Sequence, residues 1–398
     1  HDRYRRQRQM CIRDRDCPES LFEELVDLVE SPRLLQGSIA ERFLSLPPEV
    51  IITVMQAHQR YVPLKVPEVT PDPLQLEATG VLQRDFLLVG NGLEAADALI
   101  TRGNERVLAA RLADAEFFLS VDRRQPSSVR REALDRVTFA EGLGSLLDRC
   151  QRIERTARQL VDQLNLDAHQ GEAAIRAAHF CKHDLVSQMV GEFPELQGLM
   201  GGKYLLEEGE PKEVALAVVE HYLPRGAGDQ LPSSDAGAVV ALAERLELLL
   251  SIFAKGERPS GSSDPYALRR AGNGLLQIVW DRGWRLDLSR FLGSAVEDWA
   301  ALFPEFAIDS SALHQDLCQL LRQRIVSQLE DEGFVPDLVQ AVSAESVATE
   351  RLLADPMDVR ERLDLLNALR QSKALPGLMA VVPVSYTHLR AHETDRHR

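Results

Sequence analysis

The spacing of apolar residues beyond residue 95 most constrains the fold of this chain. Leu108, Leu112, Ala115 and Leu119 recur at intervals of four, three and four residues, which places them on one face of a helix. Apolar residues also recur at intervals of four between residues 313 and 329, which predicts a second long helix. Helical spacing continues to residue 370, so the sequence predicts a predominantly helical α+β protein.

Residues 19–92 have a different pattern. Leu21–Glu30 has helical spacing, and Pro48 suits the first turn of a helix that ends near His58. The Asn91-Gly92 dipeptide predicts a turn. Short apolar runs predict three strands, at residues 34–39, 61–66 and 85–89. We therefore expect a small mixed α/β module in this part of the chain.

A linker and a capped helix are expected near residue 264. Residues 256–264 are dense in glycine, proline and serine, as is typical of a linker. Asp264 suits an N-cap and Pro265 suits the first helical position, which predicts a helix from Pro265 to about Trp280. Further helices are expected at residues 144–164, 173–190, 211–221, 237–253, 347–353 and 359–370.

The composition limits the class of protein. Although 44% of the residues are hydrophobic, no run of about 18 apolar residues exists, so no membrane-spanning helix is expected. The five cysteines form no Cys-x-x-Cys pair, which favours a reducing cytoplasm over a disulfide framework. The formal net charge of −15 is untypical of a nucleic-acid-binding protein, although a local basic surface can still bind RNA.

The two ends of the chain differ from the rest. Residues 1–15 and 385–398 together hold nine arginines and four of the ten histidines, with almost no apolar periodicity. They could be basic arms that bind RNA phosphates. We favour the alternative that segments 1–18 and 385–398 are foreign tails derived from sequencing adapters.

His179, His183 and Asp184 are the candidate metal ligands. Histidines followed by a His-Asp pair are the ligand pattern of metal-dependent phosphohydrolases of the HD type, in which the metal activates water. A helix would place His179 and His183 one turn apart on one face. Glu244 would be a further carboxylate. We favour the alternative that these are ordinary polar positions of a helix and that no metal binds.

Three longer segments resemble, in the same order, signature segments of one family, the beta subunit of bacterial tetrameric glycyl-tRNA synthetase. The resemblance extends over about residues 19–375. Relatives have further sequence at both sides, so the chain resembles an internal fragment. The segments are Gly103–Leu119 (GNERVLAARLADAEFFL), Cys181–Gly202 (CKHDLVSQMVGEFPELQGLMGG) and Ser263–Gly274 (SDPYALRRAGNG).

This resemblance implies a role and a domain order. The chain would bind and position tRNA-Gly while the alpha subunit catalyses ATP-dependent glycylation, in a tetramer of two alpha and two beta subunits. ATP and Mg²⁺ would be used through the alpha subunit, and no cofactor or catalytic residue is expected in this chain. The implied domains are the mixed module 19–92, a helical HD-like domain at 93–255, a linker with connecting helices at 256–300, and a helical anticodon-binding-like domain at 301–384.

Arginines are the candidate contacts to tRNA, because a guanidinium can donate two hydrogen bonds to one phosphate. Phe334 is the candidate stacking partner for an unpaired base. Arg269 and Arg270 could instead pair with Glu244 or Glu247. A metal-dependent HD-type phosphohydrolase and a helical protein-interaction scaffold remain alternatives. The candidate arginines are Arg269, Arg270, Arg322, Arg324, Arg360, Arg362 and Arg370.

Overall fold

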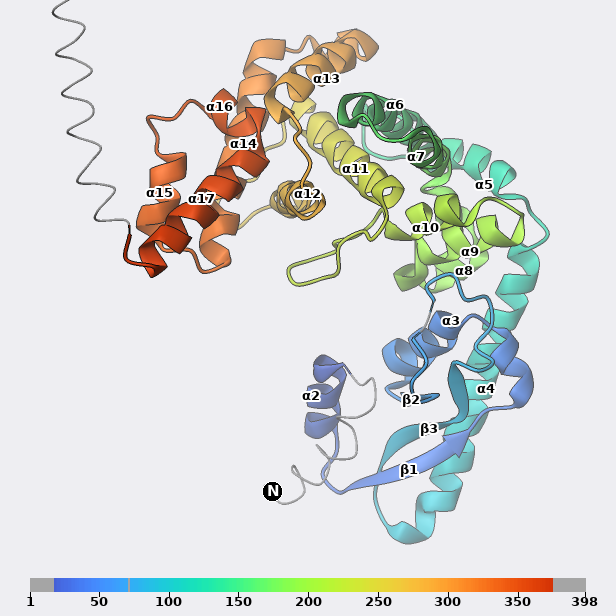
Figure 1. Ribbon diagram of the computed structural model, residues 1–398. Helices are drawn as coiled ribbons and strands as arrows, with labels where there is room; N and C mark the ends of the chain where they lie inside the picture. Colours follow the sequence, from blue (N-terminus) through green and yellow to red (C-terminus); the bar gives the residue numbers. More distant parts are fainter. Residues whose placement is uncertain (1–17, 71, 375–398) are drawn as a thin grey trace, which may run out of the picture. The chain divides into compact units, whose positions relative to one another are not determined.

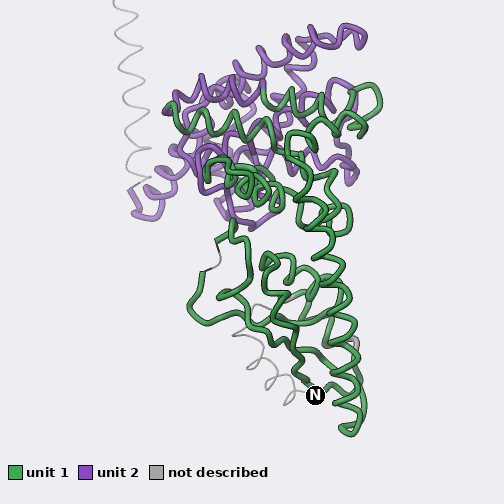
Figure 2. Tube along the Cα trace, turned by 90° about the vertical axis from the view of Figure 1, so that its right-hand side faces the viewer, with its two compact units in different colours: residues 1–154, 168–222 green, residues 155–167, 223–398 purple. Residues whose placement is uncertain are grey.

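The structure is a computed structural model that describes residues 18–70 and 72–374. Two compact units can be distinguished by their internal packing (Figure 2). Unit 1 comprises residues 1–154 and 168–222, and unit 2 comprises residues 155–167 and 223–398. The predicted tails lie outside the described residues, except for Pro18. The domain boundaries given above stay predictions.

Unit 1 contains a three-stranded antiparallel sheet with β3 in the centre (Figure 1). Leu35 of β1 pairs with Leu88 of β3, and Val62 of β2 pairs with Leu87. One face of the sheet contributes Leu35, Phe86 and Leu88 to the core of the unit. All three predicted strands are confirmed with shifted ends, as β1 (Pro32–Ser38), β2 (Val62–Lys65) and β3 (Leu82–Asn91).

The helix α4 covers this sheet (Figure 1). It runs from Asp97 to Asp122, and the four predicted apolar positions Leu108, Leu112, Ala115 and Leu119 are buried in the same core as the strands. The helix predicted up to residue 58 is confirmed in extent, but its second half is a π-helical turn. The elements are α2 (Glu19–Leu28), α3 (Pro48–Thr53) and the π turn Val54–His58.

The remainder of unit 1 is helical. The single helix predicted at residues 173–190 is wrong, because α7 ends at Phe180. A 3₁₀ turn follows at His183–Val186, and the Ser187 hydroxyl then accepts a hydrogen bond from the Val190 amide and caps α8. The helix α6 begins in unit 1 and continues into unit 2. These helices are α5 (Ser127–Ala133), α6 (Leu146–Leu164), α7 (Ala168–Phe180), α8 (Gln188–Glu192), α9 (Leu199–Glu207) and α10 (Lys212–Glu220).

Unit 2 is a helical assembly in which α11 is buried on all sides and contacts α12, α13 and α14. The long helix predicted from the leucine spacing is confirmed as α14. Within the part of the chain that the structure describes, no helix combines the length and apolar character that a membrane span requires. The helices are α11 (Asp235–Ala254), α12 (Leu268–Arg282), α13 (Leu288–Leu302), α14 (Ser310–Asp331), α15 (Pro336–Ser343), α16 (Thr349–Ala354) and α17 (Pro356–Gln371).

The start of α12 differs from the prediction. Asp264 does cap the helix, because its carboxylate accepts hydrogen bonds from the amides of Leu268 at 2.8 Å and Arg269 at 2.9 Å. However, Ala267 has a left-handed φ of 54°, which interrupts helical geometry before Leu268. The helix therefore begins at Leu268, and Pro265 lies in the preceding turn instead of at the first helical position.

Candidate functional site

The predicted metal ligand Asp184 lies in the 3₁₀ turn that follows α7 and is fully buried. One carboxylate oxygen accepts hydrogen bonds from the amides of Gly198 at 2.6 Å and Gly201 at 2.9 Å, at the N-terminus of α9. The other oxygen is buried without a hydrogen-bond partner. Burial raises the pKa of Asp184 to about 6, against these two stabilising amides. This carboxylate therefore holds the start of α9 in place.

His183 is equally buried and is held from both ring nitrogens. Its Nε2 lies 3.1 Å from the carbonyl oxygen of Gly201, and its Nδ1 lies 3.4 Å from Nε of the buried Arg130. Burial, together with the positive charge of Arg130, lowers the pKa of His183 to about 3. The ring is therefore neutral, with Nε2 donating to Gly201 and Nδ1 accepting from Arg130.

Arg130 is the residue of this group that the sequence does not reveal. Its side chain is only 1% exposed, and it donates to the carbonyl oxygens of Asp122 and Gln125 and to the hydroxyl of Ser127. It also forms an ion pair with Glu208 at 3.3 Å. No local pattern marks such an arginine, because His183 and Glu208 lie far along the chain from it.

His179 does not share a helix face with His183, so that expectation is wrong. The helix α7 ends at Phe180, and the Nδ1 of His179 lies 2.9 Å from the carboxylate of Glu154. Glu244 belongs to α11 in unit 2. Among residues 18–70 and 72–374, no group of three or more histidine, cysteine, aspartate or glutamate side chains could hold a metal ion. The geometry thus gives His183 and Asp184 a structural role.

The candidate arginines of unit 2 fall into two groups, and Arg322 represents the first. Its guanidinium donates to the carbonyl oxygens of Val347 at 2.6 Å, Ser343 at 3.0 Å and Ala344 at 2.6 Å. It also donates to the hydroxyl of Thr349 at 3.1 Å. The carbonyl groups at the end of α15 and in the connection to α16 have no partner within a helix. Arg322 stabilises this region because it donates hydrogen bonds to them.

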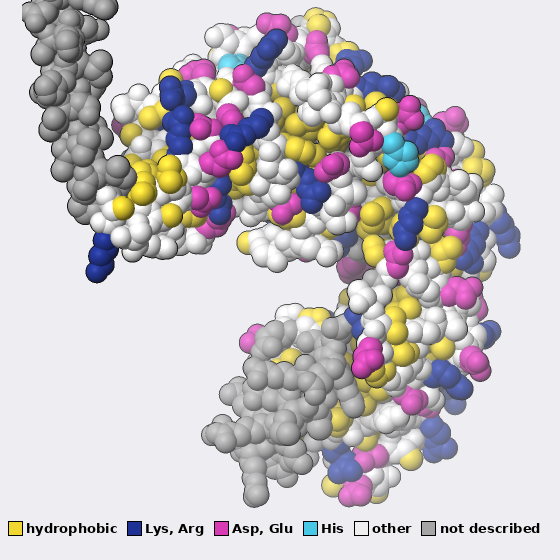
Figure 3. Space-filling model, viewed as in Figure 1, with side chains coloured by type: hydrophobic (Ala, Val, Ile, Leu, Met, Phe, Trp, Pro, Cys, Tyr) yellow, Lys and Arg dark blue, Asp and Glu magenta, His cyan; other side chains and the backbone are white. Residues whose placement is uncertain are grey.

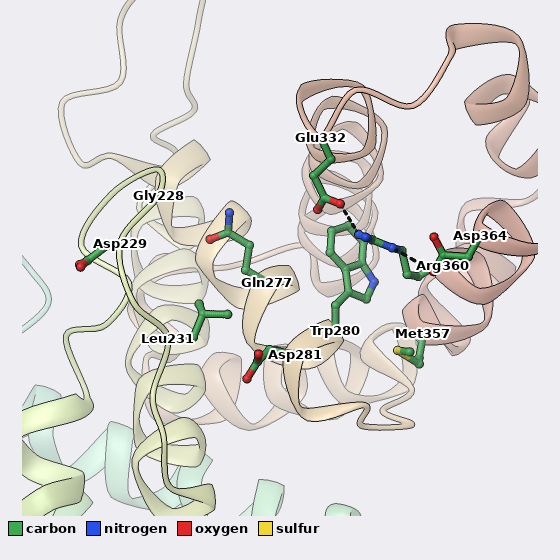
Figure 4. Close-up of a pocket in the computed structure, with 10 residues that line it drawn as sticks. All are labelled: Gly228, Asp229, Leu231, Gln277, Trp280, Asp281, Glu332, Met357, Arg360 and Asp364. Carbon is green, nitrogen blue, oxygen red and sulfur yellow. Dashed lines mark hydrogen bonds and ion pairs between the residues drawn. The ribbon is translucent and has the colours of Figure 1, made fainter. Parts of the chain in front are cut away.

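Arg360 also has partners within the fold, and it lines a pocket of about 450 Å³ in unit 2 (Figure 4). It lies between Glu332 at 2.5 Å and Asp364 at 3.3 Å. Its guanidinium stacks 5.2 Å from the centre of the Phe334 ring and 5.7 Å from that of Trp280. This contact occupies one face of Phe334, the candidate stacking partner for a base. Further lining residues are Gly228, Asp229, Leu231, Gln277, Asp281 and Met357.

Arg362 and Arg370 form surface ion pairs. Arg362 lies 2.7 Å from Asp358 on the preceding turn of α17, and Arg370 lies 3.0 Å from Asp337. Basic and acidic side chains also alternate over the visible surface as a whole (Figure 3). Exposed pairs of this kind contribute little to stability and exchange readily for other partners. Contacts of Arg362 and Arg370 to RNA stay predictions.

The second group consists of Arg269, Arg270 and Arg324. Among the described residues, none of these three guanidinium groups has a carboxylate within ion-pairing distance, so the alternative in which Glu244 or Glu247 pairs with Arg269 and Arg270 is wrong. Arg269 and Arg270 lie in the first turn of α12, and Arg324 lies on α14, which packs against it. The structure therefore brings Arg269 and Arg324 together as cations without a carboxylate partner among the described residues, with Arg270 next to Arg269 in the first turn of α12.

Comparisons with known proteins agree with one another. A family model described as glycyl-tRNA synthetase beta subunit matches residues 6–344, beginning within segment 1–18. The chain is 43% identical over 366 residues to the glycine–tRNA ligase beta subunit of Acaryochloris marina and 40% identical over 368 residues to that of Gloeothece citriformis. Each alignment covers 92% of this chain but 49% and 50% of the two relatives. The chain thus spans about half the length of the curated relatives it matches.

Proposed function

Because this chain belongs to the glycyl-tRNA synthetase beta subunit family, we propose that it binds and positions tRNA-Gly for ATP-dependent glycylation by glycine–tRNA ligase. The observation that carries this proposal is the family match over residues 6–344, together with 43% identity to a glycine–tRNA ligase beta subunit. The proposal includes an alpha subunit as the catalytic partner and a tetramer of two alpha and two beta subunits.

The proposed division of labour assigns bond-making to the alpha subunit. ATP and Mg²⁺ would bind there, and the present chain would contribute by holding the tRNA in a reactive position. Positioning of reactants can lower a barrier by about 7–11 kcal/mol when the geometry is well fixed. The described residues of this chain support such a passive role, since His183 and Asp184 are buried and engaged in hydrogen bonds within the fold.

The same proposal assigns an HD-like domain to residues 93–255 and an anticodon-binding-like domain to residues 301–384. The helical character of unit 2 and its arginine content support an RNA-binding role. A metal-dependent phosphohydrolase is not favoured, because a metal at His183 would have to displace the hydrogen bonds to Gly201 and Arg130.

The test uses the purified 398-residue chain together with a separately purified alpha subunit. We expect the chain to retain the alpha subunit in a pull-down and to bind tRNA-Gly with an affinity that falls as salt increases. Binding of the alpha subunit without any salt-dependent binding of tRNA-Gly would leave only a scaffold role. Absence of both would refute the proposal. The isolated chain should not attach glycine to tRNA, so glycylation without the alpha subunit would also refute it.

A further inference from the structure

Arg269 and Arg324 lie on the same side of α12, and the exposed Arg270 follows Arg269 in the chain, where its charge acts on Arg245. A Cβ atom added to Gly272 would stand 3.0 Å from the Cγ atom of Arg324, so the stem of Arg324 lies directly against the backbone of α12. Arg269 is three residues before Gly272 and therefore lies on the same side of the helix. One turn further along, Gln277 donates a hydrogen bond of 2.7 Å to Gln328 of α14. This bond fixes the register of the two helices and hence the position of Arg324.

Two buried polar atoms at this junction lack partners. The Nε of Arg324 and the Oδ1 of Asn273 are both shielded from solvent and make no hydrogen bond. Asn273 lies one helical turn after Arg269 and follows Gly272, against which Arg324 packs. An unpaired buried donor costs about 1–3 kcal/mol, so such atoms call for a ligand or a water molecule. The side-chain amide of Asn273 can also turn its Nδ2 group towards a ligand, since rotation about χ2 exchanges the two ends.

The local charges are not balanced within the fold. Burial and the nearby Arg269 lower the pKa of Arg324, although Asp331 and Asp264 act in the opposite direction. Arg270 likewise opposes the charge of Arg245. The Asp264 carboxylate is already engaged with the first two amides of α12. Because an arginine keeps its proton in a protein, a bound anion would reduce the mutual repulsion of these guanidinium groups.

The surroundings favour a phosphate over an acidic protein partner. Protein interfaces are held by buried aromatic or large apolar anchors. Within the described residues, no large hydrophobic side chain of α11, α12 or α14 is exposed. The preceding segment 259–263 consists of proline, serine and glycine, whose small side chains allow close approach of a backbone. Guanidinium groups match the oxygen geometry of phosphate, because they can donate two parallel hydrogen bonds to it.

We propose that Arg269 and Arg324 form a phosphate-binding site for the RNA backbone, and that Arg270 in the same first turn of α12 contacts a neighbouring phosphate. The inference rests on the proposed function and identifies which of the candidate arginines carry it. Because phosphate contacts do not read sequence, the site fixes the position of the RNA and leaves recognition to other residues. It should therefore contribute equally to the binding of tRNA-Gly and of a non-cognate tRNA.

The experiment measures binding of fluorescently labelled tRNA-Gly to the full chain by anisotropy, over salt concentrations from about 50 to about 300 mM. The variants are Arg269→Gln, Arg270→Gln, Arg324→Gln and the triple variant. Arg290→Gln is the matched control, because Arg290 is exposed and has no carboxylate within ion-pairing distance among the described residues. Tryptophan fluorescence verifies folding, since Trp280 lies on α12 itself.

We expect each of the three variants to weaken binding about tenfold at low salt and to reduce the salt slope by about one, with the same losses for a non-cognate tRNA. Arg324→Lys should recover only part of the affinity, because an ammonium group cannot reproduce the paired hydrogen bonds of a guanidinium. If Arg290→Gln loses as much affinity for tRNA as the three variants, the RNA is attracted by positive charge in general, and the proposal is overturned.

Two further outcomes separate this inference from the proposed function. If the wild-type chain binds tRNA-Gly with a normal salt slope and the triple variant does so equally well, the phosphate site is wrong while the proposed function stands. If the wild-type chain does not bind tRNA at any salt concentration, both are wrong. If the triple variant keeps its affinity for tRNA but no longer retains the alpha subunit, the cluster is a protein contact and the inference is overturned.

Discussion

Replacing His183 by glutamine should change the response of unit 1 to acid. The pKa of His183 is lowered to about 3 in the folded chain, from 6.5 in an unperturbed histidine. Between about pH 3 and pH 6.5 the unfolded chain therefore binds a proton that the folded chain does not. The free energy of unfolding then falls as the pH falls, with a slope of about 1.4 kcal/mol per pH unit for one proton.

Asp184 acts in the opposite direction. Its pKa is raised to about 6 in the folded chain, from 3.8 in an unperturbed aspartate. Between about pH 3.8 and pH 6 the folded chain binds the extra proton, so the contribution of Asp184 to the free energy of unfolding rises as the pH falls. Where the two pH ranges overlap, the contributions of His183 and Asp184 change by the same amount per pH unit and in opposite directions. They therefore nearly cancel between about pH 4 and pH 6.

A single substitution removes this cancellation. In His183→Gln the contribution of Asp184 remains, so the variant should gain about 3 kcal/mol relative to the wild type between pH 6 and pH 4. In Asp184→Asn the contribution of His183 remains, and the variant should lose about the same amount over that range. Glutamine keeps an amide within reach of the Gly201 carbonyl, which preserves the hydrogen bond now made by Nε2.

Urea unfolding at several pH values, followed by far-UV circular dichroism, measures these differences. Subtraction of the wild-type free energy at each pH removes all groups common to both proteins. All three tryptophans, Trp280, Trp284 and Trp299, belong to unit 2, so a transition seen by circular dichroism but not by fluorescence belongs to unit 1. A difference for His183→Gln that stays constant from pH 4 to pH 6.5 would refute the reasoning, because His183 would then be free to bind a proton in the folded chain.

Two further substitutions test the packing. Gly202→Ala should destabilise unit 1 by about 1–3 kcal/mol, because the new Cβ would stand 2.5 Å from the carbonyl oxygen of Ala215. Gly103→Ala should instead stabilise it by about 0.5–1 kcal/mol, since no atom lies within 4 Å of that position; urea unfolding decides both signs. Arg322→Ala should destabilise unit 2 by about 2–4 kcal/mol, measured by tryptophan fluorescence, because four hydrogen bonds are lost. Arg362→Ala should cost at most about 0.5 kcal/mol, because it breaks one exposed pair.

The sequence predicts those parts of the fold that are determined by local pattern. The predicted positions Leu108, Leu112, Ala115 and Leu119, and those at intervals of four from Leu313 to Leu329, are all buried, because a repeated spacing over several turns allows one orientation of a helix. The three strands were predictable for a similar reason, since alternating or continuous apolar runs bounded by turns favour extended structure. Element ends were less accurate, as at β3, where the strand begins at Leu82.

The sequence does not predict features whose cause lies elsewhere in the chain. The break between α7 and α8 depends on amides of Gly198 and Gly201, which Asp184 can reach only after the chain has folded. The late start of α12 depends on the left-handed backbone of Ala267, a conformation that an alanine gives no reason to expect. Only Ser187, a good capping residue, offers a local signal for either change.

The same limit applies to the candidate site, because charge is visible in sequence while ion pairing is not. Arg322 and Arg324 lie two positions apart on α14 and are indistinguishable by composition. Arg322 donates to four acceptors between the end of α15 and the start of α16. Arg324 lies against Gly272, and its Nε has no hydrogen-bond acceptor. Gly272 was the available signal, since a glycine inside a helix often marks close approach of another group.

The pair His183 and Asp184 is fully buried, whereas Arg270 is exposed and Arg269 and Arg324 are half-buried. His183 and Asp184 can change protonation, so burial shifts each pKa and the pair needs no external ligand. Arg269, Arg270 and Arg324 have no such option, because a guanidinium stays charged at any pH at which the protein is folded. Guanidinium groups that keep their charge and have no carboxylate within ion-pairing distance among the described residues can bind an anion, as proposed above. This difference in chemistry is the reason for assigning a structural role to His183 and Asp184 and a binding role to the arginines.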